Sequence, residues 1–98
     1  MNEKILTLLG FARKAGRLAV GTQATETSIK RGKSRLALVA SDISGKSAKE
    51  IRFLCDKHDT SFGVLPFDTY DITKAIGTKA GILSVEDDGF ADAIAQKL

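Results

Sequence analysis

A glycine, a hydroxyl and an amide in succession, Gly21-Thr22-Gln23, supply the groups that a nucleic-acid contact needs. A glycine lets a phosphate backbone approach the main chain closely, and a helix capped by Thr22 would direct free N–H groups at a phosphate. Gln23 carries both a donor and an acceptor, so it can read the edge of a base. Three cations follow, namely Arg31, Lys33 and Arg35. This combination predicts phosphate and base contact, although a capped surface helix with solvated charges accounts for the same residues.

The segment Ser44-Gly45-Lys46-Ser47 offers a second phosphate-binding pattern, because it follows an apolar run and opens a predicted helix. A nucleotide-binding P-loop would need a glycine at position 40, where this sequence has Ala40. The segment therefore favours a polar loop in which Ser44 or Ser47 caps a helix. Nucleotide hydrolysis through Lys46 is the alternative, and phosphate contact at this helix N-terminus stays open.

The sequence lacks the residues that a metal site or a catalytic nucleophile would need. Cys55 and His58 are the only cysteine and histidine, whereas a zinc site takes about four such ligands. Both fall on the apolar stripe of a predicted helix, which favours a buried, apolar role for Cys55. The adjacent acids Glu86-Asp87-Asp88 are typical of a helix start, where they cap and complement the dipole. We therefore expect no enzymatic activity, no metal and no cofactor.

Charge is divided unevenly along the chain. Residues 1–52 contain eleven Lys and Arg against four Asp and Glu, a net +7, while residues 53–98 contain four against eight, a net −4. With 98 residues, of which 43% are apolar, residues 1–98 suit a single domain with one core. Such asymmetry within one domain predicts a positive face that attracts phosphate.

The same composition bears on where the protein works. A single cysteine and the absence of a secretory apolar segment predict a reducing cytoplasm. No apolar run approaches the roughly 18 residues of a membrane span, so no membrane contact is expected. The short length and polar exterior favour a monomer.

Helix and strand patterns alternate along the chain and must position the side chains named above. Helices are predicted at 3–15, 22 to 30 or 31, 46–58, 68 or 69 to 76, and from about 87, and strands at 18–20, 36–40, 61–65 and 81–85. Asn2 is the expected cap of the first helix. The expected helix stops are Gly16, Gly32 and Gly77.

This alternation predicts an α/β fold, a three-layer helix/sheet/helix sandwich around a four-stranded mixed, largely parallel sheet. Residues 36–40 (LALVA) are apolar without alternation, which is typical of a central strand covered on both faces. Folds of this type place their sites in loops after the carboxyl ends of strands. The basic connections at 21–23 and 30–35 lie beside the first two strands.

The stretch LLGFARKAGRLAVGTQATETSIKRGKSRLALVASD resembles the ribosomal protein L7Ae family, which binds kink-turn RNA, and especially its small bacterial, ribosomal-protein-like members. The resemblance continues through LCDKHDTSFGVLPFDTYDITKAIGTKAGILSV, in which residues 72–77 stand for a family signature of the Leu-Gly-x-Ala-x-Gly type. It covers nearly the whole chain. It implies the same sandwich fold and an RNA partner, ribosomal RNA with a kink-turn above all.

The resemblance also implies which residues hold the RNA. The family's segment after the first strand reads Gly-x-Asn-Glu-x-x-Lys, and here Gly21 matches the glycine while Gln23 replaces the asparagine. Ala24 replaces the glutamate, Thr27 replaces the lysine, and Arg31-Gly32 match an Arg-Gly of the family. A loop before the last strand would cover a base flipped out of the kink. The resulting RNA-binding set is Gly21, Thr22, Gln23, Thr27, Arg31, Lys33, Lys79, Ala80, Gly81 and Ile82.

Two departures from the family pattern bear on specificity. Ala24 and Thr27 lack the side chains that recognise guanines, and each lost bidentate contact costs about 1–3 kcal/mol if RNA edges behave like those of DNA. We therefore expect RNA binding with weakened kink-turn specificity or a different RNA preference. The alternative is a protein-interaction domain of the same fold that has lost RNA recognition.

Overall fold

The computed structural model describes residues 3–98, so the expected cap Asn2 lies outside the described residues. Helices and strands alternate in the predicted order, with boundaries that differ from the expected ones by a few residues at most. The helices are α1 (Glu3–Lys14), α2 (Thr22–Lys30), α3 (Gly45–Lys57), α4 (Thr69–Ile76) and α5 (Asp88–Ala95). The strands are β1 (Leu18–Val20), β2 (Leu36–Val39), β3 (Ser61–Val64) and β4 (Ile82–Val85).

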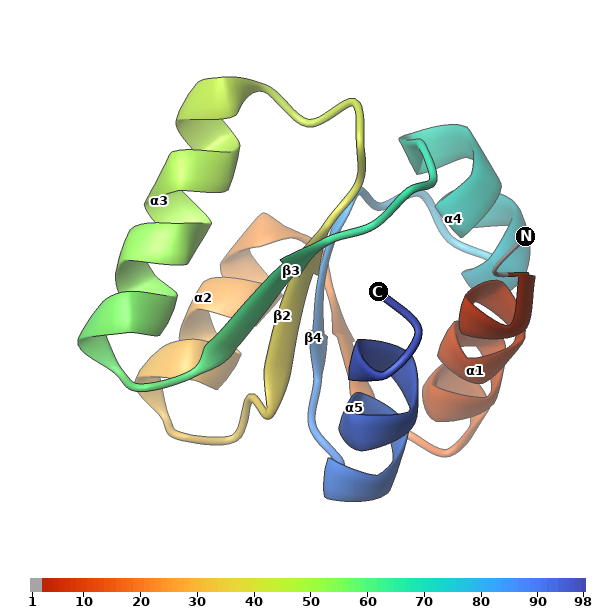
Figure 1. Cartoon of the computed structure of the whole chain (residues 1–98), viewed down its shortest axis with the longest axis horizontal. Helices are drawn as coiled ribbons and strands as arrows, with labels where there is room; N and C mark the ends of the chain where they lie inside the picture. The colour runs from red at the N-terminus through yellow and green to blue at the C-terminus, as the bar shows by residue number, and fades with distance from the viewer. Residues whose placement is uncertain (1–2) are drawn as a thin grey trace.

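The four strands form one sheet in the order β1-β4-β2-β3, with helices on both sides (Figure 1). Helices α2 and α3 cover one face, and α1, α4 and α5 cover the other. The predicted three-layer sandwich and the mixed sheet are therefore confirmed. No helix in residues 3–98 is long and apolar enough to cross a membrane.

The expectation of a largely parallel sheet is wrong. Only β2 and β3 are parallel, whereas β4 pairs antiparallel with both β1 and β2. The reason lies in the path of α4 and the loop that follows it. Gly81 packs against Thr69 at the start of α4, so the chain returns to the end of the sheet from which α4 began. From there β4 can only run back against β2.

Strand β2 confirms the prediction of a central strand covered on both faces, because Leu36, Ala37, Leu38 and Val39 are all buried. Leu36 and Leu38 belong to the core beneath α1, α4 and α5, while Ala37 and Val39 pack beneath α2 and α3. Side chains alternate across a strand, so one short strand links both halves of the core.

Side-chain caps begin three of the helices. The Ser44 hydroxyl accepts a hydrogen bond from the Ser47 N–H at 3.2 Å, which confirms the capping interpretation of the Ser-Gly-Lys-Ser segment. Asp68 caps α4 through the N–H of Asp71 at 2.9 Å. Asp87 caps α5 in the same way, as expected of the Glu86-Asp87-Asp88 acids.

The helix carrying Cys55 and His58 follows its predicted stripe only in part. Cys55 is fully buried, and burial raises the pKa of its thiol to about 11, with a further contribution from the charge of Asp56. His58 is exposed, because α3 ends at Lys57 and His58 is its C-cap. Within residues 3–98 no group of three or more His, Cys, Asp or Glu could hold a metal ion.

Candidate nucleic-acid interface

Gly21 joins the two segments that the sequence proposed for RNA binding. It links β1 to α2 with a φ of 101° and a ψ of 165°, a backbone conformation essentially restricted to glycine. Its N–H donates to the carbonyl oxygen of Ile82 at 2.9 Å. The start of α2 and the loop before β4 therefore meet at one end of the sheet, although they are sixty residues apart in the sequence.

Thr22 is not the cap of α2, contrary to expectation. Gly21 occupies the N-cap position, and Thr22 is the first helical residue, with its side chain exposed. Because glycine has no side chain, it offers no acceptor to the amides of the first turn, which helix geometry leaves without intrahelical partners. These N–H groups belong to an exposed turn that includes Gln23, and free amides at a helix N-terminus suit an anion.

A shallow groove of about 480 Å³ runs along α2 and contains four of the predicted RNA-binding residues. Gln23, Thr27 and Arg31 are spaced four residues apart, so they lie along one face of the helical segment. Lys33 joins them from the turn that follows. The groove is lined by Ala19, Gln23, Ala24, Thr27, Ser28, Arg31, Lys33 and Glu86.

The opposite side of α2 explains why this face points outward. Thr25, Ser28 and Ile29 are buried where α2 packs on β4. Ser28 Oγ and Ser84 Oγ share a buried hydrogen bond of 2.8 Å, which fixes the helix over the strand. This contact sets the rotation of α2, and it leaves Gln23, Thr27 and Arg31 exposed.

The end of α2 directs Lys33 back toward the groove. Gly32 adopts a φ of 74°, its N–H donates to Ile29 O, and the N–H of Lys33 donates to Ser28 O. These paired bonds close the helix in a Schellman turn. Arg35, the third cation considered for phosphate contact, is instead 3.2 Å from the Asp88 carboxylate and donates to Gly32 O.

Glu86 is the charged groove residue that the sequence did not assign to the site. Its N–H donates to Arg17 O at 2.8 Å, which places it where β4 ends beside the start of β1. The pairing of Val85 with Leu18 sets this position. Only the antiparallel register of β1 and β4 could have revealed the position of Glu86. The sequence pattern instead favoured parallel pairing.

The loop before β4 presents fewer side chains than expected. Lys79 is exposed, but Ala80 and Ile82 are only 7% and 4% exposed and pack in the core. Gly81 is held by the Ala40 N–H, which donates to its carbonyl oxygen at 2.7 Å. A Cβ at Gly81 would lie 2.6 Å from the Ile43 side chain. The loop can therefore offer Lys79 and main chain, rather than apolar side chains, to a flipped base.

Asp42 links the loop after β2 to the start of α4 at this end of the sheet. One carboxylate oxygen accepts from both the N–H and the hydroxyl of Thr69, at 3.0 and 2.8 Å. The hydroxyl bond is the main reason that the pKa of Asp42 is lowered. Thr69 in turn packs against Gly81, so Asp42 supports the wall formed by the loop before β4.

Comparison with known proteins identifies the fold's relatives. Over residues 3–95 the chain matches the ribosomal protein L7Ae/L30e/S12e/Gadd45 family. The chain belongs to this family. The resemblance inferred from the sequence is thereby confirmed across almost all of the described residues.

Two relatives within the family carry descriptive names. The chain is 30% identical over 93 residues to the RNA-binding protein YlxQ of Enterococcus faecium, covering 91% of this chain and 85% of that protein. It is 26% identical over 94 residues to the large ribosomal subunit protein eL30 of Dictyostelium discoideum, covering 94% and 84% of the two.

Two solved structures share the fold of this L7Ae-family chain. A protein of unknown function from Bacillus halodurans C superposes with a TM-score of 0.90 at 25% identity, covering 96% of this chain and 95% of that one. The Giardia lamblia 15.5kD RNA binding protein superposes with a TM-score of 0.80 at 15% identity, covering 99% and 87%. At that identity the Giardia protein shows the common fold alone.

Proposed function

We propose that this protein binds RNA through the groove along α2 and acts as a ribosomal or ribosome-associated protein that recognises kink-turn or similarly irregular RNA. The observation that carries the proposal is the meeting of Gln23, Thr27, Arg31 and Lys33 in one groove. Family membership and the names of two relatives, an RNA-binding protein and a ribosomal subunit protein, support it.

Each group in the groove has a distinct chemical task. Arg31 and Lys33 are exposed cations suited to phosphate oxygens. Gln23, at the first turn of α2, can accept from and donate to a base edge. The Gly21 main chain lets the RNA backbone come close, and the first-turn amides bind phosphate.

Glu86 gives the groove a negative group beside Arg31 and Lys33. A carboxylate repels phosphate but accepts hydrogen bonds from base N–H donors. It therefore restricts which part of the RNA can lie at that end of the groove. Bases displayed by an irregular, unstacked RNA suit this arrangement, whereas the regular phosphate array of a straight duplex does not.

The proposal is tested by titrating the protein with a kink-turn RNA, a straight RNA duplex and a single strand in gel shifts. We expect the kink-turn RNA to bind most tightly and affinity to fall steeply with salt. Arg31→Ala should weaken binding, while Lys57→Ala, on the far end of α3, serves as a matched control. Equal affinity for all three RNAs would remove the specific claim.

Absence of RNA binding at low salt would overturn the proposal and favour the protein-interaction alternative, which Ala24 and Thr27 make chemically credible. Nucleotide binding lost in Lys46→Ala would instead favour the phosphate-dependent alternative. We further propose that the protein works as a monomer in the cytoplasm, with ribosomal RNA as its partner. Crosslinking in cells followed by sequencing of the bound RNA identifies that partner.

A further inference from the structure

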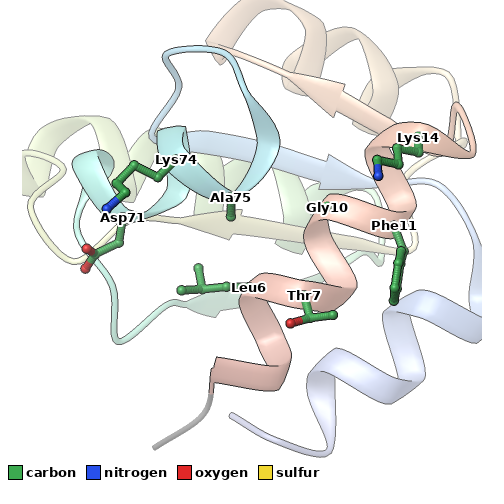
Figure 2. Close-up of a pocket in the computed structure, with 8 residues that line it drawn as sticks. All are labelled: Leu6, Thr7, Gly10, Phe11, Lys14, Asp71, Lys74 and Ala75. Atoms are coloured by element: carbon green, nitrogen blue, oxygen red, sulfur yellow. The ribbon is translucent and has the colours of Figure 1, made fainter.

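Two exposed aromatic rings lie on the face of the sheet opposite α2. Phe11 on α1 is 54% exposed, and Tyr70 on α4 is 67% exposed. Helices α1 and α4 pack against each other, and a groove of about 460 Å³ lies along their junction (Figure 2). Phe11 lines this groove, and an exposed ring in a groove is a feature on which proteins stack unpaired bases.

The floor of this α1/α4 groove is made by small or half-buried residues. Gly10 lies so near α4 that an added Cβ would be 3.1 Å from the Ala75 carbonyl oxygen. Leu6 completes the floor beside them, and Phe11 stands on the same helix (Figure 2). Small and apolar residues in the same groove as an exposed ring suit the apolar face of a base.

The rim of the groove is predominantly basic. Lys14 and Lys74 line it together with one acid, Asp71. The ammonium of Lys74 lies 5.4 Å from the centre of the Tyr70 ring, so cation and ring stand together. Lysines can pair with phosphates, while the Asp71 carboxylate can accept from base N–H groups.

The chemistry of this face favours a nucleic-acid strand over a protein helix. A docked amphipathic helix is held by a row of apolar anchors at helical spacing. On α1 and α4 the large apolar side chains that are exposed are the two rings, Phe11 and Tyr70. Rings interspersed with lysines match the alternation of bases and phosphates in a single strand.

Between Lys14 of this groove and Ala19 of the groove along α2, the chain carries the exposed Arg17. Strand β1 lies at the edge of the sheet, so the two faces meet around it. Arg17, exposed at the start of β1, is bonded through its carbonyl to Glu86 of the α2 groove. Lys14 lies three residues before Arg17. RNA leaving the α2 groove past Arg17 would therefore meet Lys14 and Phe11.

We propose that the α1/α4 groove binds a single-stranded segment of the same RNA, with a base stacked on Phe11 and phosphates paired with Lys14 and Lys74. The identity of the strand as an extension of the bound RNA rests on the proposed function. The groove's affinity for single-stranded RNA does not, because it can be measured without a kink-turn.

The test compares a blunt kink-turn RNA with the same RNA carrying an oligouridine extension at one end or the other. We expect one of the extensions to raise affinity about tenfold, equivalent to about 1.4 kcal/mol, which one stacked base can supply. Phe11→Ala or Lys14→Glu should abolish that gain, and Phe11→Tyr should keep it. Phe53→Ala, which removes another exposed ring, on α3, should leave the gain unchanged.

Separate measurements distinguish the failure of this inference from that of the proposed function. If the protein fails to bind the blunt kink-turn RNA, that result counts against the proposed function of the α2 groove and not against the α1/α4 groove. Oligouridine alone should crosslink under ultraviolet light to the peptide containing Phe11. No gain from either extension, or a gain that survives Phe11→Ala, overturns the proposal. Binding of an acidic peptide that needs Phe11, without any response to the extension, overturns it in favour of a protein partner.

Discussion

Replacing Gly21 with alanine tests the claim that this residue joins the two halves of the α2 interface. Its φ of 101° and ψ of 165° lie in a region of backbone angles that is favourable for glycine alone. Holding another residue in that conformation costs about 1–3 kcal/mol. An added Cβ would meet no atom within 4 Å, so the penalty comes from the backbone and not from crowding. The alternative for the chain is to rotate and break the bond from Gly21 to Ile82, which costs about 0.5–1.5 kcal/mol.

Both routes lower stability, and thermal unfolding followed by circular dichroism measures the loss. A domain of this size loses roughly 4–8 °C of Tm for each kcal/mol, so Gly21→Ala should unfold several degrees below the native protein. Its RNA affinity should fall as well, because the first turn of α2 moves relative to the loop before β4.

Gly45→Ala is the matched control for this substitution. Gly45 also meets no atom within 4 Å of an added Cβ, but it is the first residue of α3 and lies outside the positive-φ region. Alanine there should leave Tm unchanged or slightly raised. A Gly21→Ala protein with the Tm and RNA affinity of the native chain would refute the reasoning.

Four further outcomes follow from the same contacts. Glu86→Gln should strengthen binding to all RNAs at low salt and steepen the salt dependence, since it removes a negative charge beside Arg31; gel shifts across a salt series check this. Ala24→Glu combined with Thr27→Lys should raise the preference for kink-turn RNA over duplex at least about tenfold, because both positions are exposed in the groove and each restored contact is worth about 1–3 kcal/mol. Native Cys55 should resist alkylation at mildly basic pH until denaturant is added, because burial raises its pKa to about 11. Asp42→Asn should reduce the loss of stability in acid: the folded pKa is lowered, so the carboxylate stabilises the fold above the unfolded pKa and that stabilisation is lost as pH falls through the folded value.

The order and type of the elements could be predicted because they depend on local pattern. The spacing of apolar residues predicts the helices, and the unbroken apolar run of β2 predicts a strand that is covered on both faces. The caps at Ser44, Asp68 and Asp87 follow from side chains that bond amides three residues away. Each of these features is determined by a short stretch of chain.

Strand direction could not be predicted in the same way. The placement of β4 between β1 and β2 depends on how α4 packs and on the close approach of Gly81 to Thr69 and Ile43. No local pattern encodes such contacts. Two features of the candidate site have the same origin: Glu86 lines the groove, and Ala80 and Ile82 are buried in the core.

Strand β4 determines the geometry of the α2 interface along its whole length. Its first residue, Ile82, accepts the hydrogen bond from Gly21. Its third, Ser84, bonds Ser28 on the buried side of α2. The residue after the strand, Glu86, lines the far end of the groove. Removing the Ser84 hydroxyl would leave that of Ser28 buried without a partner, at a cost of about 1–3 kcal/mol. The same strand forms part of the core and orients α2, so buried contacts determine the geometry of the exposed groove. Substitutions of buried residues beneath α2 should therefore alter the distances from Glu86 to Gln23, Thr27 and Arg31.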